Sequence, residues 1–327
     1  MLAMKICIVG AGAIGGFLGI RLANAGHQVT LLARGKHLQA IRTNGAKLIE
    51  SNREIKVNLI ASDDPEDFGP QDCLFITVKT PSLNEILPKL TPLLDDNTTV
   101  ISAMNGIPWW FLQNLKGPLK GHLLNSIDPK NTLLKTLPIE RIIGCVVHAG
   151  SSVVEPGVIH HASGDLFIIG EPDGKIKERT LKIKESINQS NLNCKITENI
   201  HTEIWSKLVG NMGMGPISAL TKLTLLGVAN DPDARKISIA MMEEAISIGK
   251  ELNLNIGMTA DARVDIGAEL GNFKPSILQD LEKGRPMEID ALIGVVAEIG
   301  KLINIPTPNI DIVLALQRAQ ARNLGLY

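Results

Sequence analysis

The 327-residue sequence lacks several features that would place it in a common class of protein. Its formal net charge is only -1, which gives no electrostatic case for binding nucleic acid or an anionic membrane surface. It contains no internal repeat and no low-complexity tract. It also has no apolar run of the roughly 18 residues that a transmembrane helix needs. These absences favour a soluble, cytoplasmic protein, and the length allows two domains with separate cores.

Cysteine is scarce as well. The four cysteines stand at positions 7, 73, 145 and 194, without a Cys-x-x-Cys pair or a His-rich spacing that would suit a metal. We therefore expect no metal site, and we predict that these residues are reduced, small members of the core.

The N-terminal segment Ile6–Ile20 carries no charge and follows a single Lys5, as the core of a signal peptide would. Five glycines and a change from strand to helix pattern argue against that interpretation. The segment instead predicts an apolar strand, a glycine-rich turn and the helix Phe17 to Ala25. The turn reads Gly10-Ala11-Gly12-Ala13-Ile14-Gly15.

Each glycine of this turn has a physical role in a dinucleotide-binding site. Gly10 makes the tight turn, Gly12 lets the backbone approach a pyrophosphate, and Gly15 lets the helix pack close to the strand. Unpaired N–H groups at the helix N-terminus then face the phosphates. A glycine-rich turn can also be only a turn, but its position between strand and helix favours the nucleotide site.

The residues after the second predicted strand, Gln28 to Leu32, indicate which cofactor is bound. An NAD site usually has an acid here to accept hydrogen bonds from the ribose 2′-hydroxyl. The sequence has Arg34 and Lys36 instead. Because a guanidinium can bind a 2′-phosphate through two charge-assisted hydrogen bonds, we expect NADP(H). The alternative is that both are solvated loop charges.

The pattern of elements predicts an α/β fold, with an N-terminal Rossmann-type doubly wound sheet followed by an all-α C-terminal domain. Strands are expected at Lys5 to Val9, Gln28 to Leu32, Cys73 to Val78, Thr98 to Ser102 and Arg141 to Val147, with an antiparallel extension of the sheet edge at Gly157 to His161 and Leu166 to Ile169. Helices are expected at Ile200 to Leu220, Asp233 to Leu252, Ser276 to Gly284 and Ile289 to Leu302. The domains are predicted as residues 1–198 and 199–327.

Three short segments of the sequence contain candidate functional residues. Lys79 and the pair Asn105-Gly106 follow predicted strands, where ligands of such folds bind, although a lone lysine and an Asn-Gly turn are common without function. Lys207 and Asn211 are spaced to share one helical face. On its own, Lys207 also fits a residue that buries its stem and exposes its charge.

Taken in order, these motifs resemble the ketopantoate reductase family over nearly the whole chain. The matching segments are Gly10-Ala11-Gly12-Ala13-Ile14-Gly15, Ala33-Arg34-Gly35, Val78-Lys79, Asn105-Gly106, Lys207-x-x-x-Asn211, Ser276-x-Leu278-Gln279-Asp280 and Glu288-Ile289-Asp290. No single motif is specific, but the ordered set is.

The resemblance implies NADPH-dependent reduction of 2-dehydropantoate to pantoate, a step towards pantothenate and coenzyme A, in a cleft between domains. It implies that Lys207 is the general acid and Glu288 its catalytic partner. Substrate contacts are implied for Asn105, Asn211 and Ser276, and cofactor contacts for Lys79, Asn105 and Glu288 beside the glycine turn and Arg34. The alternative for Glu288 is a surface acid at a helix start.

One departure affects the expected substrate. Family members often continue as Lys-x-x-x-Asn-x-x-x-Asn-Pro, whereas this chain has Gly215 at the second asparagine, and Trp109 and Trp110 stand beside the predicted site. The expected partner is therefore a small 2-oxo acid, either ketopantoate or a bulkier one, with a homodimer left open. A protein that binds NADPH without catalysis is the remaining alternative.

Overall fold

The computed structural model describes residues 3–327, which divide into two compact units. The first unit contains the chain up to Met104 and the segment Thr132–Ile200, and the second combines Asn105–Asn131 with His201–Tyr327. The segment Asn105–Asn131 falls within residues 1–198, which the sequence analysis gave to the first domain. This return of the chain leaves no local pattern in the sequence, because the segment contains neither a strand nor a helix.

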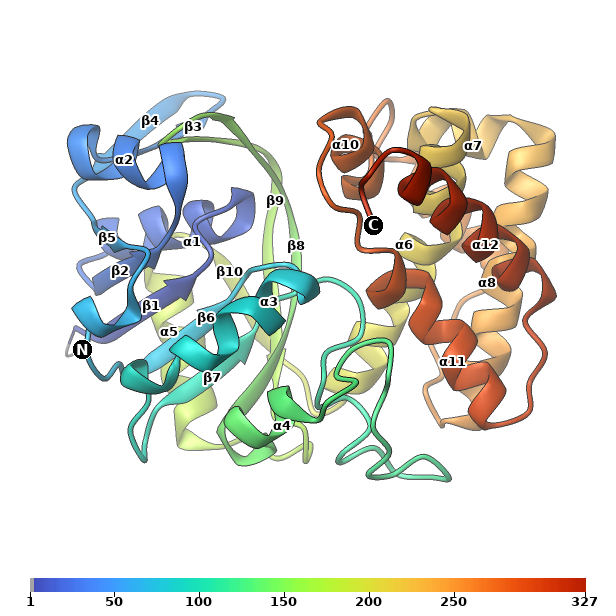
Figure 1. Ribbon diagram of the computed structural model, residues 1–327, viewed down its shortest axis with the longest axis horizontal. Helices are drawn as coiled ribbons and strands as arrows, with labels where there is room; N and C mark the ends of the chain where they lie inside the picture. The colour runs from blue at the N-terminus through green and yellow to red at the C-terminus, as the bar shows by residue number, and fades with distance from the viewer. Residues whose placement is uncertain (1–2) are drawn as a thin grey trace. The chain divides into compact units, whose positions relative to one another are not determined.

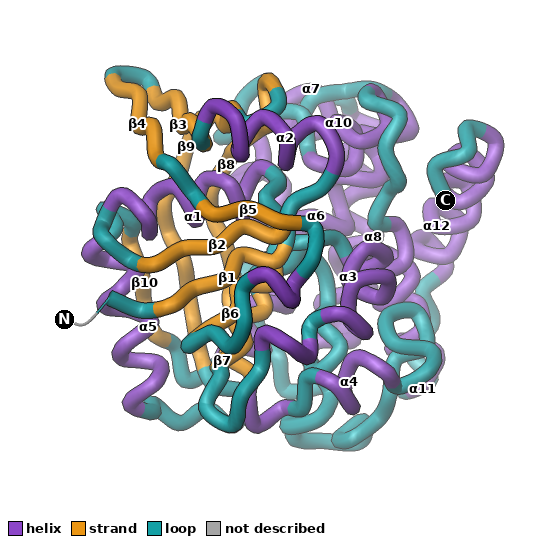
Figure 2. The backbone as a smooth tube through the Cα atoms, turned by 60° about the vertical axis from the view of Figure 1, so that its left-hand side comes forward, coloured by secondary structure: helices purple, strands orange, loops and turns teal. Residues whose placement is uncertain are grey.

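Within the described residues, ten strands of the first unit form one mixed sheet, drawn in orange in Figure 2. The strands are β1 (Lys5–Val9), β2 (Gln28–Leu32), β3 (Ala46–Glu50), β4 (Arg53–Val57), β5 (Ile60–Ser62), β6 (Cys73–Ile76), β7 (Thr99–Ser102), β8 (Ile142–Glu155), β9 (Val158–Gly170) and β10 (Asn193–Ile196). Their order is β4-β3-β9-β8-β7-β6-β1-β2-β5, and β10 pairs with β9. Within the run β8-β7-β6-β1-β2-β5, every pair of adjacent strands is parallel. This confirms the expected Rossmann-type arrangement.

The helices of this unit connect the parallel strands, as the sequence pattern requires (Figure 1). They are α1 (Ala13–Asn24), α2 (Gly35–Asn44), α3 (Thr80–Ile86), α4 (Thr132–Thr136) and α5 (Glu178–Gln189). Helix α1 packs across the sheet, and its Phe17 and Ile20 are fully buried with Ile8 and Leu31 of the central strands. This core fixes the turn between β1 and α1.

The sheet differs from the sequence prediction at β9. The two runs Gly157 to His161 and Leu166 to Ile169 were expected as separate pieces at the sheet edge, but they belong to one strand between β3 and β8. The strand continues through Gly164, which has a φ of 69°, next to an irregularity in the register with β8 after His148. A bulge of this kind bends a strand without ending it, so the Ser-Gly turn signal was misleading.

The four cysteines are buried, as the sequence predicted, and all belong to the first unit. Burial raises the pKa of the Cys7 and Cys194 thiols to about 12. These two therefore stay protonated at neutral pH and behave as small apolar side chains.

The second unit is helical, which confirms the all-α C-terminal domain that the sequence predicts. Its helices are α6 (Ile200–Thr221), α7 (Leu225–Asn230), α8 (Pro232–Glu251), α9 (Ala260–Ala268), α10 (Ser276–Glu282), α11 (Val295–Leu302) and α12 (Pro308–Asn323), with the π-helical turn η5 (Asp290–Gly294) before α11. The helix expected from Ile289 to Leu302 is therefore present without a break, and it contains a π-helical turn near its start. Among residues 3–327, no helix has both the length and the apolar character needed to cross a membrane.

Candidate active site

The turn between β1 and α1 in the first unit has the shape that its glycines predict. Gly10 has a φ of 103°, and a Cβ there would lie 2.4 Å from Val78 Cγ1. A Cβ on Gly15 would lie 2.0 Å from the Gly10 carbonyl oxygen and 2.4 Å from Thr77 Oγ1. Thr77 Oγ1 also donates a hydrogen bond of 2.7 Å to that carbonyl. Only glycine fits at positions 10 and 15.

Gly12 differs from the other two glycines because a Cβ there would meet nothing within 4 Å. It is the N-cap of α1, and no side chain caps this helix end. The first turn of α1 also contains no acidic residue. The first N–H groups of α1 and the positive end of its dipole are therefore not capped by a side chain, which suits the pyrophosphate of a dinucleotide.

Arg34 lies just beyond the end of β2, where the sequence predicts the 2′-phosphate site. Its side chain is 80% exposed, and its nearest acid is Glu85, with 3.7 Å between Arg34 Nη1 and Glu85 Oε2. An ion pair between two such exposed groups contributes little. The guanidinium is therefore able to exchange this contact for a phosphate. Lys79 is half-buried at the N-cap of α3, three residues after the end of β6, which pairs with β1.

Helix α6 of the second unit carries Lys207, whose side chain is directed to a residue far away in the sequence. Lys207 Nζ donates a hydrogen bond of 2.9 Å to Asn105 Oδ1. Both residues are half-buried. The alternative of a lysine with a solvated charge therefore does not describe Lys207, because its ammonium is held by a specific amide.

The loop after Asn105 is fixed against the turn that follows Glu288. Gly106 has a φ of 78°, and a Cβ there would lie 2.3 Å from the carbonyl oxygen of Ala291 in η5. The N–H of Ile107 donates to the same oxygen at 3.3 Å. π-Helical turns of this kind are frequent at functional sites. The close approach places Asn105 beside the segment that begins with Glu288.

Glu288 is 8% exposed, so the alternative of a surface acid is wrong. Asp290, the other acid of the same motif, has a structural part instead. It accepts hydrogen bonds from the guanidinium of Arg318 on α12 and, at 2.8 Å, from the Tyr327 hydroxyl near the end of the chain. Sequence reasoning had no signal for this anchoring of α12, since the partners are far apart along the chain.

Asn211 lies on α6, and Ser276 begins α10, whose second residue packs against α6. Asn211 follows Lys207 by one helical turn and is half-buried. Ser276 is the exposed first residue of α10. The next residue, Ile277, lies against α6, because its Cγ2 would be 3.2 Å from a Cβ on Gly215. Ile277 therefore borders the space left by Gly215, which weakens the case for an enlarged substrate pocket.

The two tryptophans are part of the core of the second unit. Trp109 and Trp110 are 3% and 0% exposed, and Trp110 meets the ring of His201 edge-on at 5.5 Å. Burial lowers the pKa of His201 to about 4, so its ring is neutral at physiological pH. The suggestion that the tryptophans influence substrate choice is not supported, since both side chains are buried and the Trp110 ring packs against the start of α6.

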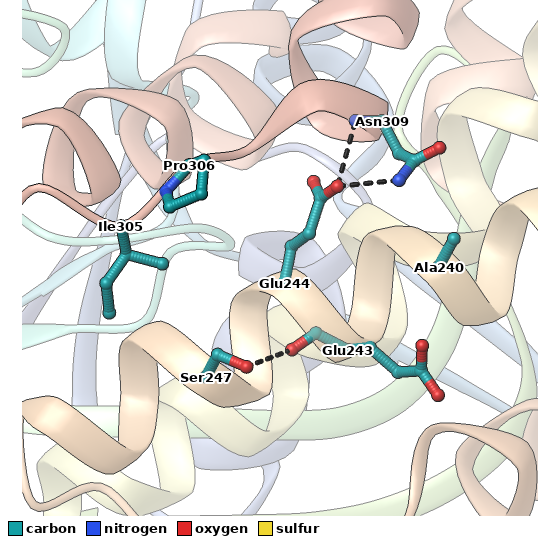
Figure 3. A pocket seen from close by; sticks show the side chains of 7 residues that line it. All are labelled: Ala240, Glu243, Glu244, Ser247, Ile305, Pro306 and Asn309. Carbon is teal, nitrogen blue, oxygen red and sulfur yellow. Dashed lines mark hydrogen bonds between the residues drawn. The ribbon is translucent and has the colours of Figure 1, made fainter.

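A separate pocket in the second unit lies between α8 and the segment before α12 (Figure 3). Its central acid, Glu244, accepts hydrogen bonds from the Asn309 N–H, the Asn309 amide and the Ile310 N–H at 2.7 to 3.0 Å. The two backbone N–H groups belong to the first turn of α12, where they have no partner within the helix, so Glu244 caps that helix. We assign this pocket a structural role.

Comparison with known proteins agrees with the geometry. The family model "Ketopantoate reductase PanE/ApbA" matches residues 6–109, and "Ketopantoate reductase PanE/ApbA C terminal" matches residues 199–321. A relative from Mesorhizobium japonicum, named 2-dehydropantoate 2-reductase, is 42% identical over 99% of this chain and 100% of its own length.

Solved structures show the same fold. A protein from Ralstonia solanacearum MolK2, named as a candidate ketopantoate reductase, matches with a TM-score of 0.95 and 40% identity over all of both chains. A D-mandelate dehydrogenase in complex with NADH and anilino(oxo)acetate matches with a TM-score of 0.86 over 99% of this chain and 100% of its own. Its 21% identity supports a shared fold alone.

Proposed function

Because the chain belongs to the ketopantoate reductase family, we propose that it reduces 2-dehydropantoate to pantoate with NADPH, a step towards pantothenate and coenzyme A. The observation that carries the proposal is the hydrogen bond of 2.9 Å from Lys207 Nζ to Asn105 Oδ1, in the unit that also buries Glu288. Ketone reduction needs an oriented proton donor from the protein, and a buried carboxylate of the same unit is available to position the substrate.

The first unit contains the residues that would hold the cofactor. The open N-terminus of α1 at Gly12 suits the pyrophosphate, and the tight contacts of Gly10 and Gly15 keep the turn in place. The exposed guanidinium of Arg34 would bind a 2′-phosphate. Lys79, at the end of a neighbouring strand, would contact the same ligand. When bound, NADPH supplies the hydride for the C2 carbon of the substrate.

Lys207 would supply the proton. As the ketone becomes an alcohol, negative charge develops on its oxygen, and an ammonium stabilises that charge and then transfers a proton to the oxygen. Asn105 would orient the ammonium by accepting a hydrogen bond from one of its N–H groups. The reaction leaves Lys207 as a neutral amine, and solvent returns its proton.

Glu288, Asn211 and Ser276 would position the substrate around Lys207. A buried carboxylate at Glu288 accepts from a substrate hydroxyl or keeps the lysine charged before the reaction. In the described part of the chain, the side chains of Asn211 and Ser276 make no hydrogen bond within the protein, so both have capacity for a ligand. Asn105 and Glu288 would also lie near the cofactor.

The experiment that tests the proposal is NADPH oxidation by the purified protein across a panel of 2-oxo acids. The panel should include ketopantoate, smaller 2-oxo acids and acids with a bulky or aromatic side chain. We expect the highest kcat/KM with ketopantoate. A clear preference for a bulky acid would instead identify a different reductase, and the absence of turnover with every acid would indicate a protein that only binds NADPH. Assembly as a homodimer stays a prediction.

A further inference from the structure

A cation in the second unit has no role in the site described so far. Arg263 of α9 lies flat against Gly210 of α6, because a Cβ on that glycine would be 2.4 Å from Arg263 Nη2 and 2.6 Å from both Cζ and Nε. The three short distances mean that the face of the guanidinium covers the Cα of Gly210. Any other residue at position 210 would displace the arginine.

This contact belongs to a regular packing of α9 along α6. One turn further along both helices, a Cβ on Gly267 would lie 2.3 Å from the Met214 sulfur. Gly267 follows Arg263 by four residues, and Met214 follows Gly210 by four. The two contacts in step hold α9 at a fixed register on α6. Arg263 is therefore positioned by the helix pair and not by a charge.

Arg263 has no acidic partner among the residues that the structure describes. Its Nε is buried without a hydrogen bond, and burial lowers the pKa of the guanidinium. The two acids of the same helix, Asp261 and Asp265, are engaged elsewhere, because each accepts from Arg235 Nη2 at 2.8 Å. Removing a cation from water without a counter-charge costs free energy, and binding an anion would offset that cost.

The Arg263 guanidinium lies against α6 about one helical turn from Lys207. Gly210 follows Lys207 by three residues and directly precedes Asn211, so all three share one side of α6. Side chains at such a spacing start about 5–6 Å apart. Since the guanidinium lies where a Gly210 side chain would begin, a second positive group stands beside the base of the Lys207 side chain.

We propose that Arg263 binds the carboxylate of the 2-oxo acid, an inference that rests on the proposed function. In a 2-oxo acid the carboxylate is bonded directly to the ketone carbon. If Lys207 serves the ketone oxygen, the group that binds the carboxylate must lie within a short distance of it. A guanidinium binds a carboxylate through two parallel N–H donors. This pairing balances the negative charge and also fixes the orientation of the adjacent ketone.

The test compares a 2-oxo acid that the wild type reduces with the methyl ester of the same acid, which has no negative charge. Arg263→Ala is expected to raise KM for the acid roughly 10- to 150-fold, the value of a hydrogen-bonded charge, and to leave KM for the ester unchanged. A purely structural role would change both substrates alike. Equal effects on acid and ester, or no effect on the acid, would overturn the proposal.

Two further variants keep the test decisive if Arg263→Ala folds poorly. Gly210→Ala places a methyl group where the guanidinium lies, and alanine favours a helix more than glycine does. It should reproduce the selective rise in KM for the acid with the fold retained. Arg235→Ala is the matched control, because it removes the ion pairs with Asp261 and Asp265 and should leave KM for both substrates unchanged.

A failure of the proposed function gives a different result. If the wild type reduces no 2-oxo acid, that function is wrong, and the anion site is then examined by calorimetry with oxamate, an unreactive analogue of a 2-oxo acid. Binding to the wild type that is lost in Arg263→Ala would still support a carboxylate site. Equal binding to both proteins, or none to the wild type, would overturn it.

Discussion

The two units build their parts of the site in opposite ways. In the first, the backbone makes the site: the turn from β1 to α1 is shaped by Gly10 and Gly15, and its open end at Gly12 offers N–H groups. In the second, side chains from distant parts of the chain converge on α6, where Lys207 meets Asn105. A backbone site needs glycines at close spacing, whereas a side-chain site needs tertiary packing to bring its members together.

Loss of the Lys207 side chain in the second unit should have the largest effect on turnover. We predict that Lys207→Ala lowers kcat by roughly 10²- to 10⁴-fold, because it removes the positioned proton donor. The affinity for NADPH and the free energy of unfolding should be retained, since that ligand is expected on the first unit. Steady-state kinetics and a cofactor fluorescence titration measure the two effects. Lys250→Ala, at an exposed lysine of α8, is the control. Turnover close to wild type would remove Lys207 from the mechanism.

A change in a side chain of the first unit should alter the choice of cofactor instead of the chemistry. Arg34→Ala is expected to reduce the preference for NADPH over NADH by about 1.5–3 kcal/mol, or roughly 10- to 150-fold, because it removes charge-assisted hydrogen bonds to the 2′-phosphate. The ratio of kcat/KM for the two cofactors gives the answer. Equal use of both by the wild type would contradict the assignment of Arg34.

Substitutions at two glycines of the turn between β1 and α1 should distinguish an effect on stability from an effect on cofactor binding. Gly15→Ala places a Cβ 2.0 Å from a backbone carbonyl, so it should lower the free energy of unfolding by about 1–3 kcal/mol. Gly12→Ala meets nothing within 4 Å and should cost less than about 1 kcal/mol. It should nevertheless weaken NADPH binding by about tenfold or more, through overpacking against the pyrophosphate. Urea unfolding and a fluorescence titration of both variants test this contrast. Comparable losses of stability would show that the space at Gly12 is not reserved for a ligand.

The same difference between the units explains what the sequence could predict. The strand and the turn around Gly10 were predicted correctly because all the determinants are local, whereas α1 begins at Ala13, four residues before the predicted start at Phe17. The short strands β3, β4, β5 and β10 were missed, since their pairing depends on partners elsewhere in the sheet. Propensity over three to five residues is too weak to identify such strands. The fold class was nonetheless clear from the alternation of strands and helices.

In the second unit, periodicity predicted α6 to within one residue, but no local pattern could show that Lys207 reaches Asn105. The resemblance to a family placed both residues in the site without predicting their hydrogen bond, and it gave no information on residues outside the family motifs. Arg263 was missed for this reason. Its only sequence signal was Gly210, since a glycine inside a helix costs about 1 kcal/mol and often marks a close contact.

The smallest expected effect concerns Gly215, where family members have an asparagine. Restoring the amide would add one hydrogen bond to ketopantoate, worth about 0.5–1.5 kcal/mol, or roughly 2- to 12-fold in kcat/KM. Ile277 opposes this gain, because its Cγ2 would be 3.2 Å from the new Cβ. We therefore expect Gly215→Asn alone to be close to neutral on ketopantoate.

The double variant Gly215→Asn/Ile277→Leu should reveal the full gain. Leucine keeps the volume of Ile277 but has no second γ-carbon, and such exchanges usually cost less than about 1.5 kcal/mol. Ile277→Leu alone is the control for the packing change. If the natural substrate were a larger 2-oxo acid, the asparagine would occupy its space and lower kcat/KM for that acid. The two substrates thus respond with opposite sign, and a loss on ketopantoate in the double variant would argue that Ile277, and not an amide, is the group this protein needs at the wall of its site.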